Sequence, residues 1–212
     1  MLIDRAGLPF IAIAAAPAII ALLWRAPGWA VLLLALPIAI ALFFRDPERT
    51  PPAAADGLVL SPADGKVMFA GDGRPGETPP GAWRHVTIFL SPLDVHINRV
   101  PVSGTVTRVV YRAGTFQPAY QASAHANEQS EIWIDHDGEV VVARQVVGRM
   151  ARRVVCRLVA GATVAAGARF GLMKFGSRMD VFVPMTATLL VTAGRRVRGG
   201  ETPVARLSAG VT

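Results

Sequence analysis

Two long uncharged runs at the N-terminus constrain the fold of this chain more than any other feature. Residues 6–24 and 26–44 each contain 19 residues without a charge, and only Arg25 separates them. Each run approaches the ~20 residues that a membrane-spanning helix needs. The junction WRAPGW combines a Pro-Gly turn with two tryptophans, whose rings favour the headgroup level of a bilayer. The pattern predicts a hydrophobic helical hairpin over residues 1–45 that anchors the protein in a membrane.

A cleaved signal peptide is the alternative interpretation, because Arg5 precedes an apolar run and the stretch AAAPA supplies small residues. The second apolar run follows at once, however, and the single cysteine, Cys156, cannot form an intrachain disulfide. These features favour the anchor. A hairpin returns the chain to its starting side, and Arg45 and Arg49 flank its exit. The positive-inside tendency therefore predicts that the remaining domain lies on the cytoplasmic side of the inner (cell) membrane.

The charge balance indicates the kind of surface that the protein meets. The net charge is +7, and the chain after residue 50 holds 18 basic against 12 acidic residues. A basic domain tethered to a bilayer is attracted to anionic lipid headgroups. The sequence contains no Lys/Arg run interleaved with aromatics and no zinc or recognition-helix motif, so nucleic acid is not expected as a partner. An anionic membrane surface is the expected partner.

Short β-branched runs punctuated by glycine make up the rest of the chain, and the one weak candidate for an amphipathic helix after residue 50 covers 117–128. Turn signals such as ADG and DHDG separate the runs at the spacing of an antiparallel sheet. The sequence therefore predicts a mainly β, barrel-sandwich-like antiparallel domain over residues 46–212. The proline-rich segment 45–57 is expected to be a linker or an extended lead-in strand.

A weak internal repeat supports this architecture. The segments GATVAAG at 161–167 and GRRVRGG at 194–200 share glycine, valine and glycine at intervals of three. Such segments form strand-to-strand corners in sandwiches of the lipoyl and biotinyl type, because glycine permits the positive φ of the corner while valine fills the core. We expect a pseudo-symmetric sandwich with one such corner in each half.

Polar residues gather at two strand ends. His96 lies in FLSPLDVHINRVPVSG, between two apolar strands and close to Asp94, Asn98 and Arg99, and strand-end turns are where side chains converge on sites. A similar turn, LSPADGKV, carries Asp64. Periodicity alone would make Asp64 the cap of an Asp-Gly turn.

The other three histidines are weaker candidates. His85 begins a predicted strand and His136 lies in a predicted hairpin turn, so a solvated structural role is expected for both. His125 lies in the polar stretch YQASAHANEQSE, which is predicted to be a loop over a site.

Gly176 and Ser177 interrupt an otherwise apolar strand, LMKFGSRMDVFVP. A glycine backbone bends freely, and a serine side chain is a nucleophile. The plain alternative is a β-bulge with a solvent-facing serine.

Four segments occur in order along the chain: SPADGKV, LSPLDVHINRVPVSG, ANEQSE and KFGSRMDVFVP. With the N-terminal hairpin and a length of 212 residues, they make the chain resemble the short-type, pyruvoyl-dependent phosphatidylserine decarboxylase proenzymes. The resemblance covers nearly all of the chain.

The resemblance implies that the chain cuts itself between Gly176 and Ser177. A β chain of residues 1–176 and an α chain of residues 177–212 would remain a non-covalent heterodimer, with a higher oligomer left open. Ser177 would become a covalently bound pyruvoyl group, one per αβ unit, and no metal or added cofactor is expected. The implied substrate is phosphatidylserine, whose amine would form a Schiff base with the pyruvoyl carbonyl before decarboxylation to phosphatidylethanolamine.

By the same resemblance, Asp64 and His96 would assist Ser177, the imidazole as base and the carboxylate as the group that orients it. Longer members of the family carry two histidines three residues apart in this turn, the second being the usual base. This chain instead has His96 followed by Arg99. Either His96 performs both tasks, or another group shares the work.

Two other function classes fit parts of the sequence. VAAGARFGLMKFGSRM resembles the tip of a biotinyl or lipoyl carrier domain, which would make Lys174 a swinging-arm attachment site, although Leu172 replaces the usual acidic residue. A membrane-tethered serine hydrolase would use Ser177, His96 and Asp64 on an external substrate, but the chain lacks a G-x-S-x-G elbow.

Overall fold

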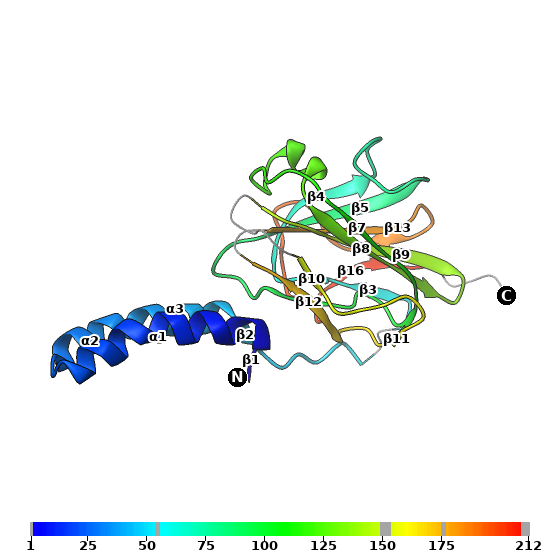
Figure 1. The fold of residues 1–212 in the computed structure, drawn as a ribbon. Coiled ribbons are helices and arrows are strands. Elements are labelled where there is room, and N and C mark those ends of the chain that lie inside the picture. Colours follow the sequence, from blue (N-terminus) through cyan, green and yellow to red (C-terminus); the bar gives the residue numbers. More distant parts are fainter. Residues whose placement is uncertain (1, 54–55, 149–153, 175–176, 209–212) are drawn as a thin grey trace. The chain divides into compact units, whose positions relative to one another are not determined.

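The chain divides into two compact units, residues 1–48 and 49–212. The computed structural model describes residues 2–53, 56–148, 154–174 and 177–208 (Figure 1). Phe175 and Gly176, on the N-terminal side of the predicted cleavage bond, lie outside the described residues.

The first unit is a hairpin of apolar helices, as predicted. Helix α1 packs against α2 and α3, which return along it (Figure 1). A two-residue strand at each end of the hairpin joins the ends in an antiparallel pair, with Leu2 opposite Asp46. The elements of this unit are β1 (Leu2–Ile3), η1 (Arg5–Gly7), α1 (Leu8–Leu23), α2 (Pro27–Leu33), α3 (Ala35–Phe43) and β2 (Arg45–Asp46).

The surface of the hairpin is apolar. The helix over Arg5–Leu23 is long and apolar enough to cross a membrane, whereas Pro27–Phe43 is a shorter apolar helix. Large side chains on both helical arms are exposed, including Trp24 at 81% and Val31 at 71%. Contiguous exposed apolar surface of this kind is typical of membrane contact. The hairpin therefore supports membrane association.

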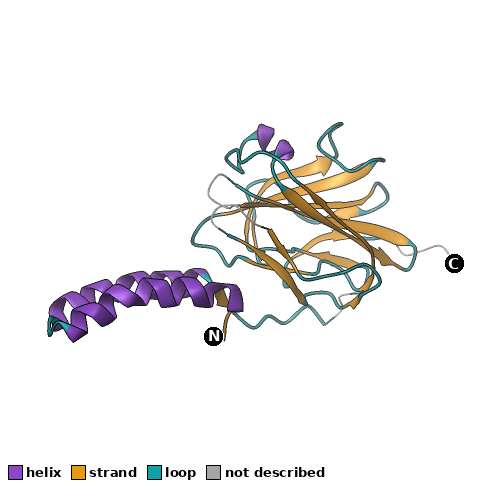
Figure 2. Ribbon diagram, in the orientation of Figure 1, coloured by secondary structure: helices purple, strands orange, loops and turns teal. Residues whose placement is uncertain are grey.

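The second unit is mainly β, which confirms the predicted fold class (Figure 2). Its largest element is a curled sheet of eight antiparallel strands. In spatial order the strands are β11 (Thr163–Val164), β7 (Gly104–Arg112), β8 (Gln129–His136), β9 (Glu139–Val146), β13 (Ser177–Pro184), β5 (Trp83–Leu90), β4 (Gly65–Asp72) and β15 (Arg196–Val197).

Two small antiparallel sheets complete this unit. One has the order β10 (Val154–Cys156), β12 (Arg169–Met173) and β6 (Ile97–Arg99). The other has the order β14 (Thr188–Leu189), β16 (Pro203–Arg206) and β3 (Leu58–Leu60). The weak helix candidate over 117–128 contains the short 3-10 helix η2 (Ala122–Ala126).

The two G-x-x-V-x-x-G segments form matching corners, as the repeat predicted. Their four terminal glycines have φ between 77° and 94°, the left-handed region that favours glycine. In each corner both glycine N–H groups donate to main-chain carbonyl oxygens of facing segments at 2.7–2.8 Å: Gly161 to Val106 and Gly167 to Val100 in one, Gly194 to Val67 and Gly200 to Ser61 in the other.

Strand β13 lies between β5 and β9 and is buried on both faces. Side chains alternate along a strand, so Ser177 shares a face with Met179 and Val181, which belong to the hydrophobic core. Arg178 and Asp180 occupy the opposite face and are also buried. The strand that follows the predicted cut is therefore held on all sides.

A buried polar cluster holds the second face of β13. Arg178 donates to Asp180 Oδ2 through Nε and Nη2, at 3.1 and 2.9 Å, and Thr87 Oγ1 donates to Asp180 Oδ1 at 2.9 Å. His85 Nε2 lies 3.1 Å from Asp180 Oδ1, and its ring stacks on Phe182. The predicted solvated role of His85 is wrong: the side chain is buried, because strand pairing places it between two aromatic rings and a carboxylate.

Asp180 is kept ionised in this cluster. Burial alone would raise its pKa, but Arg178, His85 and Arg144 outweigh burial and hold the pKa of Asp180 well below its usual range. A depressed folded-state pKa stabilises the fold above the ordinary carboxyl pKa, and this contribution is lost as the pH falls towards the folded value.

We expect Asp180→Asn to lower the free energy of unfolding at neutral pH by about 3–5 kcal/mol, because it removes the negative charge that Asp180 sets against the buried Arg178 guanidinium. Thr87→Val is the matched control: it removes one hydrogen bond to the same carboxylate and should cost about 1 kcal/mol. Urea unfolding followed by tryptophan fluorescence measures both. A wild-type midpoint for the Asp180→Asn variant at pH 7 would contradict the assigned role.

Candidate active site

Four neighbouring strands of the large sheet, β13, β5, β4 and β15, begin or end at the same level, so that their terminal residues form a row across the sheet. Strand β13 begins at Ser177, which pairs with Leu90 at the end of β5. Lys66 pairs with Phe89, and the antiparallel register therefore sets Gly65, the first residue of β4, beside Leu90. Gly65 in turn pairs with Val197 at the end of β15.

This row brings the predicted residues to the same end of the sheet. Neighbouring strands are about 4.8 Å apart, so the Cα atoms of Ser177 and Gly65, two strands away, are separated by about 10 Å. Asp64 directly precedes Gly65. The loop that carries His96 starts after Leu90, between the two. Segments more than 80 residues apart in the chain thus meet at one edge.

Ser177 is fully buried on the core side of β13. Its Oγ makes no hydrogen bond with any residue in the described part of the chain. The pairing of β13 with β5 runs from Ser177 to Pro184 without a register shift. The alternative of a solvent-facing serine is therefore wrong, because the side chain points inward and is buried.

His96 is buried, and its loop position determines which nitrogen carries a proton. Nδ1 lies 2.9 Å from the main-chain oxygen of Asp94. A carbonyl oxygen only accepts, so Nδ1 carries the hydrogen and the neutral ring presents the lone pair of Nε2. The main-chain oxygen of His96 accepts a hydrogen bond from the Met173 N–H at 3.3 Å, which ties the loop to the end of β12.

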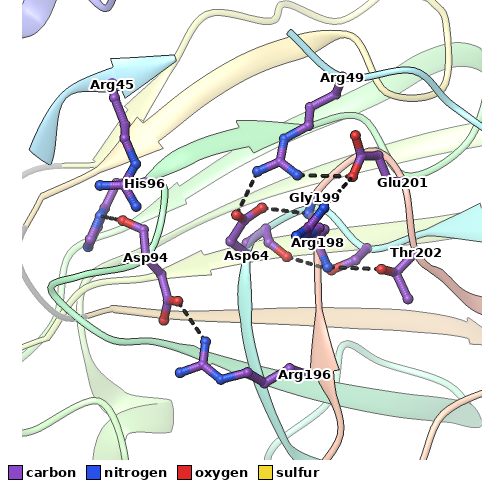
Figure 3. Close-up of polar contacts among 12 residues, drawn as sticks. Arg45, Arg49, Asp64, Asp94, His96, Arg196, Arg198, Gly199, Glu201 and Thr202 are labelled. Carbon is purple, nitrogen blue, oxygen red and sulfur yellow. Dashed lines mark hydrogen bonds and ion pairs between the residues drawn. The ribbon is translucent and has the colours of Figure 1, made fainter. Parts of the chain in front are cut away.

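Asp64 caps the glycine corner at 194–200 and also forms an ion pair with Arg49. Its Oδ1 accepts the Gly199 N–H at 2.8 Å, and its Oδ2 lies 2.8 Å from Nη2 of Arg49 (Figure 3). Burial raises the pKa of Asp64 above its usual value, although the Gly199 N–H and Arg49 oppose this rise.

A cavity of about 420 Å³ opens beside these residues. Asp94 lines it and forms an ion pair of 3.0 Å with Arg196, whose side chain is 71% exposed. The lining residues are Asp64, Asp94, Arg196, Val197, Arg198 and Thr202. The cavity therefore presents both carboxylate and guanidinium groups at the same end of the sheet as Ser177.

Asp64, His96 and Ser177 lie at the same end of the sheet. The contacts of Asp64 and His96 differ from the expected ones, in which the Asp64 carboxylate orients the imidazole. The described hydrogen bonds of Asp64 run to Arg49 and Gly199, and the tautomer of His96 is set by the Asp94 main chain. The catalytic roles of Asp64, His96 and Ser177 stay predictions.

Arg99, at the position of the second histidine in longer relatives, is buried in β6. Its Nη1 donates to the Gly167 carbonyl at 2.9 Å, so the guanidinium braces one of the two glycine corners. A guanidinium stays protonated in proteins and cannot act as a base. Of the two residues, only His96 can accept a proton from Ser177.

Sequence reasoning named Asn98 but missed Gln145 and the contacts of Arg49 at this site. Gln145 Nε2 donates to Asn98 Oδ1 at 2.7 Å, and both side chains are fully buried inside the domain. Arg49 was noted only as a flanking charge of the hairpin. For Asn98, the available signal was its inward-facing strand position two residues after His96; Gln145 and Arg49 had no local signal.

The remaining candidates lie elsewhere. His125 is exposed in η2, and His136 Nδ1 lies 2.8 Å from the Ser103 carbonyl oxygen. Lys174 follows β12, whereas β13 belongs to a different sheet. The carrier interpretation expects Lys174 at the tip of a hairpin, and strands of two different sheets on either side of it disfavour that interpretation.

Comparison with known proteins identifies the family. The family model described as phosphatidylserine decarboxylase matches residues 36–205. A phosphatidylserine decarboxylase proenzyme of Pelodictyon phaeoclathratiforme is 44% identical over 186 residues, covering 85% of this chain and 87% of the relative. Proenzymes of Granulibacter bethesdensis (46% over 174 residues, 78% and 70%) and Paramagnetospirillum magneticum (41% over 214 residues, 97% and 87%) are similar too.

The fold and the site together define a mainly β protein with a buried serine at the start of a central strand. The chain belongs to the phosphatidylserine decarboxylase family, and this membership makes it a decarboxylase.

We expect the neutral ring of His96 to be the Nδ1–H tautomer, because only that form donates to the Asp94 main-chain oxygen. Nitrogen-15 chemical shifts of the ring, assigned with a His96→Ala variant as the blank, measure the tautomer directly. An Nε2–H tautomer in the folded, uncut chain would contradict the described contact.

Proposed function

We propose that the chain is a self-processing phosphatidylserine decarboxylase that cuts its Gly176–Ser177 bond and carries a pyruvoyl group derived from Ser177. The observation that carries the proposal is the buried Ser177 hydroxyl, which has no hydrogen-bond partner in the described part of the chain. Most buried polar groups in proteins have a hydrogen-bond partner, so an unpaired hydroxyl calls for an explanation such as a chemical role.

In the proposed cut, the Ser177 hydroxyl attacks the Gly176 carbonyl and turns the amide into an ester. His96 Nε2 takes the hydroxyl proton and returns it to the Ser177 amine that is freed. Loss of the Ser177 α-proton then expels the Gly176 carboxylate and leaves dehydroalanine. Addition of water releases ammonia and gives the pyruvoyl terminus, so the atoms balance without an oxidant or a metal. Glycine at position 176 leaves the attacked carbonyl uncrowded.

The residues around Ser177 fit the product of this cut. Position 177 lies at the first residue of β13, where a chain end can form without loss of the pairs with β5 and β9. The pyruvoyl group would supply a carbonyl that binds the substrate amine and accepts the electrons left when carbon dioxide departs. The two chains, 1–176 and 177–212, would stay associated through the same pairs.

The cavity beside the site supports a zwitterionic substrate. A phosphatidylserine headgroup carries an ammonium, a carboxylate and a phosphodiester. Asp64 and Asp94 offer charges opposite to the ammonium, and Arg196 and Arg198 offer charges opposite to the anionic groups. The basic domain and the apolar hairpin would keep the site at an anionic membrane surface, and the arginines that flank the hairpin favour the cytoplasmic side.

Purified protein should contain two polypeptides that separate only under denaturing conditions. Intact-mass analysis should assign them to residues 1–176 and 177–212. The smaller one should resist Edman degradation, because a pyruvoyl terminus has no amine. A free serine at its N-terminus would refute the mechanism.

Ser177→Ala should give one uncut chain without decarboxylase activity, because alanine has no oxygen for the acyl shift. Ser103→Ala is the matched control: it removes a serine hydroxyl of the same domain away from the cut and should leave processing intact. Complete cutting of the Ser177→Ala chain would rule out the assigned bond.

His96→Ala should slow self-cleavage by about 10²–10⁴, the usual contribution of a positioned base. Asp64→Asn should slow the same step, whereas His125→Ala, on the exposed η2, should not. A pulse-chase time course is required, because slow cutting could still finish during expression. Normal kinetics in both the His96 and Asp64 variants would remove these residues from the maturation site.

A further inference from the structure

We propose that Arg49 is a positioning residue of this site: its guanidinium holds the Asp64 carboxylate ionised and in place, and so sets the pH range in which Ser177 is activated. The inference rests on the proposed self-cleavage and adds to it a residue outside the predicted triad.

Arg49 joins two carboxylates that are distant in sequence. Its Nη2 lies 2.8 Å from Asp64 Oδ2, and its Nη1 lies 3.0 Å from Glu201 Oε2 (Figure 3). The side chains of Arg49 and Asp64 are only 10% and 16% exposed, so solvent screens their contact little. An arginine with two short contacts in a mostly buried place is held in one orientation.

The internal repeat shows that the corner itself does not need this charge. Ser103 precedes Gly104 as Asp64 precedes Gly65, and Ser103 Oγ accepts the Ala166 N–H at 2.9 Å. Asp64 Oδ1 makes the matching bond to the Gly199 N–H at 2.8 Å. A neutral hydroxyl therefore suffices to cap such a corner.

What distinguishes the Asp64 corner is its second carboxylate oxygen and the Arg49 contact on it. A buried charge is costly unless a partner compensates it. Keeping a charged pair where a hydroxyl would serve is expected only if the negative charge has a use. That use is the stabilisation of the imidazolium that forms when His96 takes the Ser177 proton.

The charges around Asp64 oppose one another. Burial and the neighbouring Asp94 raise the pKa of the Asp64 carboxyl, while Arg49 and the Gly199 N–H lower it. Among the described residues, the other charged groups near Asp64 include Arg196 and Arg198, which line the same cavity, Glu201, which shares Arg49, and Arg99, which braces the Gly167 corner. Removal of the Arg49 charge leaves only the Gly199 N–H to oppose burial and Asp94, so the carboxylate should take up a proton at higher pH.

The test measures the pH dependence of self-cleavage. Full-length chains are synthesised in vitro into lipid nanodiscs, pulse-labelled and chased in buffers from acid to neutral pH. The acid limb is the part of the curve in which the cleavage rate falls as the pH is lowered. For Arg49→Gln, this limb should move to higher pH by about one unit. Arg49→Lys keeps the charge and should restore the wild-type limb. Arg195→Gln, an exposed arginine whose described bond goes to the Leu190 carbonyl, is the charge-matched control and should leave the limb in place.

Coincident limbs for Arg49→Gln and wild type would overturn the inference, as would an equal shift in the Arg195→Gln control. If the glutamine variant folds poorly, Arg49→Met, which retains the packed aliphatic stem, replaces it with the same expectation.

A second measurement separates this inference from the proposed function. In uncleavable Ser177→Ala chains, carbon-13 titration of the Asp64 carboxyl, assigned with Asp64→Asn, should show a higher pKa when Arg49→Gln is added. If the wild-type chain never cuts itself, the proposed function is refuted. The titration would still decide whether Arg49 lowers the pKa of Asp64, because it uses chains that cannot be cut. An unchanged Asp64 titration would refute the role of Arg49 even if the wild-type chain cuts itself.

Discussion

The pairing of β13 between β5 and β9 is the constraint on which the rest of the site depends. It fixes Ser177 at the first residue of a central strand, with its side chain in the core. The charged cluster around Asp180 holds the other face of the strand, so β13 cannot slip by one residue without burying Arg178 in the apolar core. A chain cut before residue 177 would lose one covalent bond and keep its ladder.

The internal repeat gives the two corners of the domain the same glycine geometry. Each half of the domain turns a corner with positive-φ glycines and one side-chain acceptor, Ser103 in one half and Asp64 in the other. Only the Asp64 half lies near the start of β13, and only there does a charged pair replace a hydroxyl. Within the described residues, then, the two corners share their glycine hydrogen bonds and differ in their charges.

Local patterns were sufficient for much of the fold and of the candidate site. The uncharged runs, the β-branched segments and the glycine spacing are periodic signals that a single stretch of chain contains, and the structure confirms the hairpin and the mainly β domain. His85 was misjudged, because strand propensity does not tell which face a neighbouring strand will cover. Gln145 and Arg49 could not be found, since their partners Asn98, Asp64 and Glu201 are close only after folding.

The sequence by itself determined the family and predicted both the bond that breaks and the nucleophile, because those depend on short motifs whose chemistry is local. The tertiary structure decided the environment of each group: that Ser177 faces the core, that the main chain of Asp94 orients His96, and that Arg49 binds Asp64. The reason is physical. Burial and charge pairing depend on distances through space, and the antiparallel register sets those distances between segments that the sequence keeps far apart.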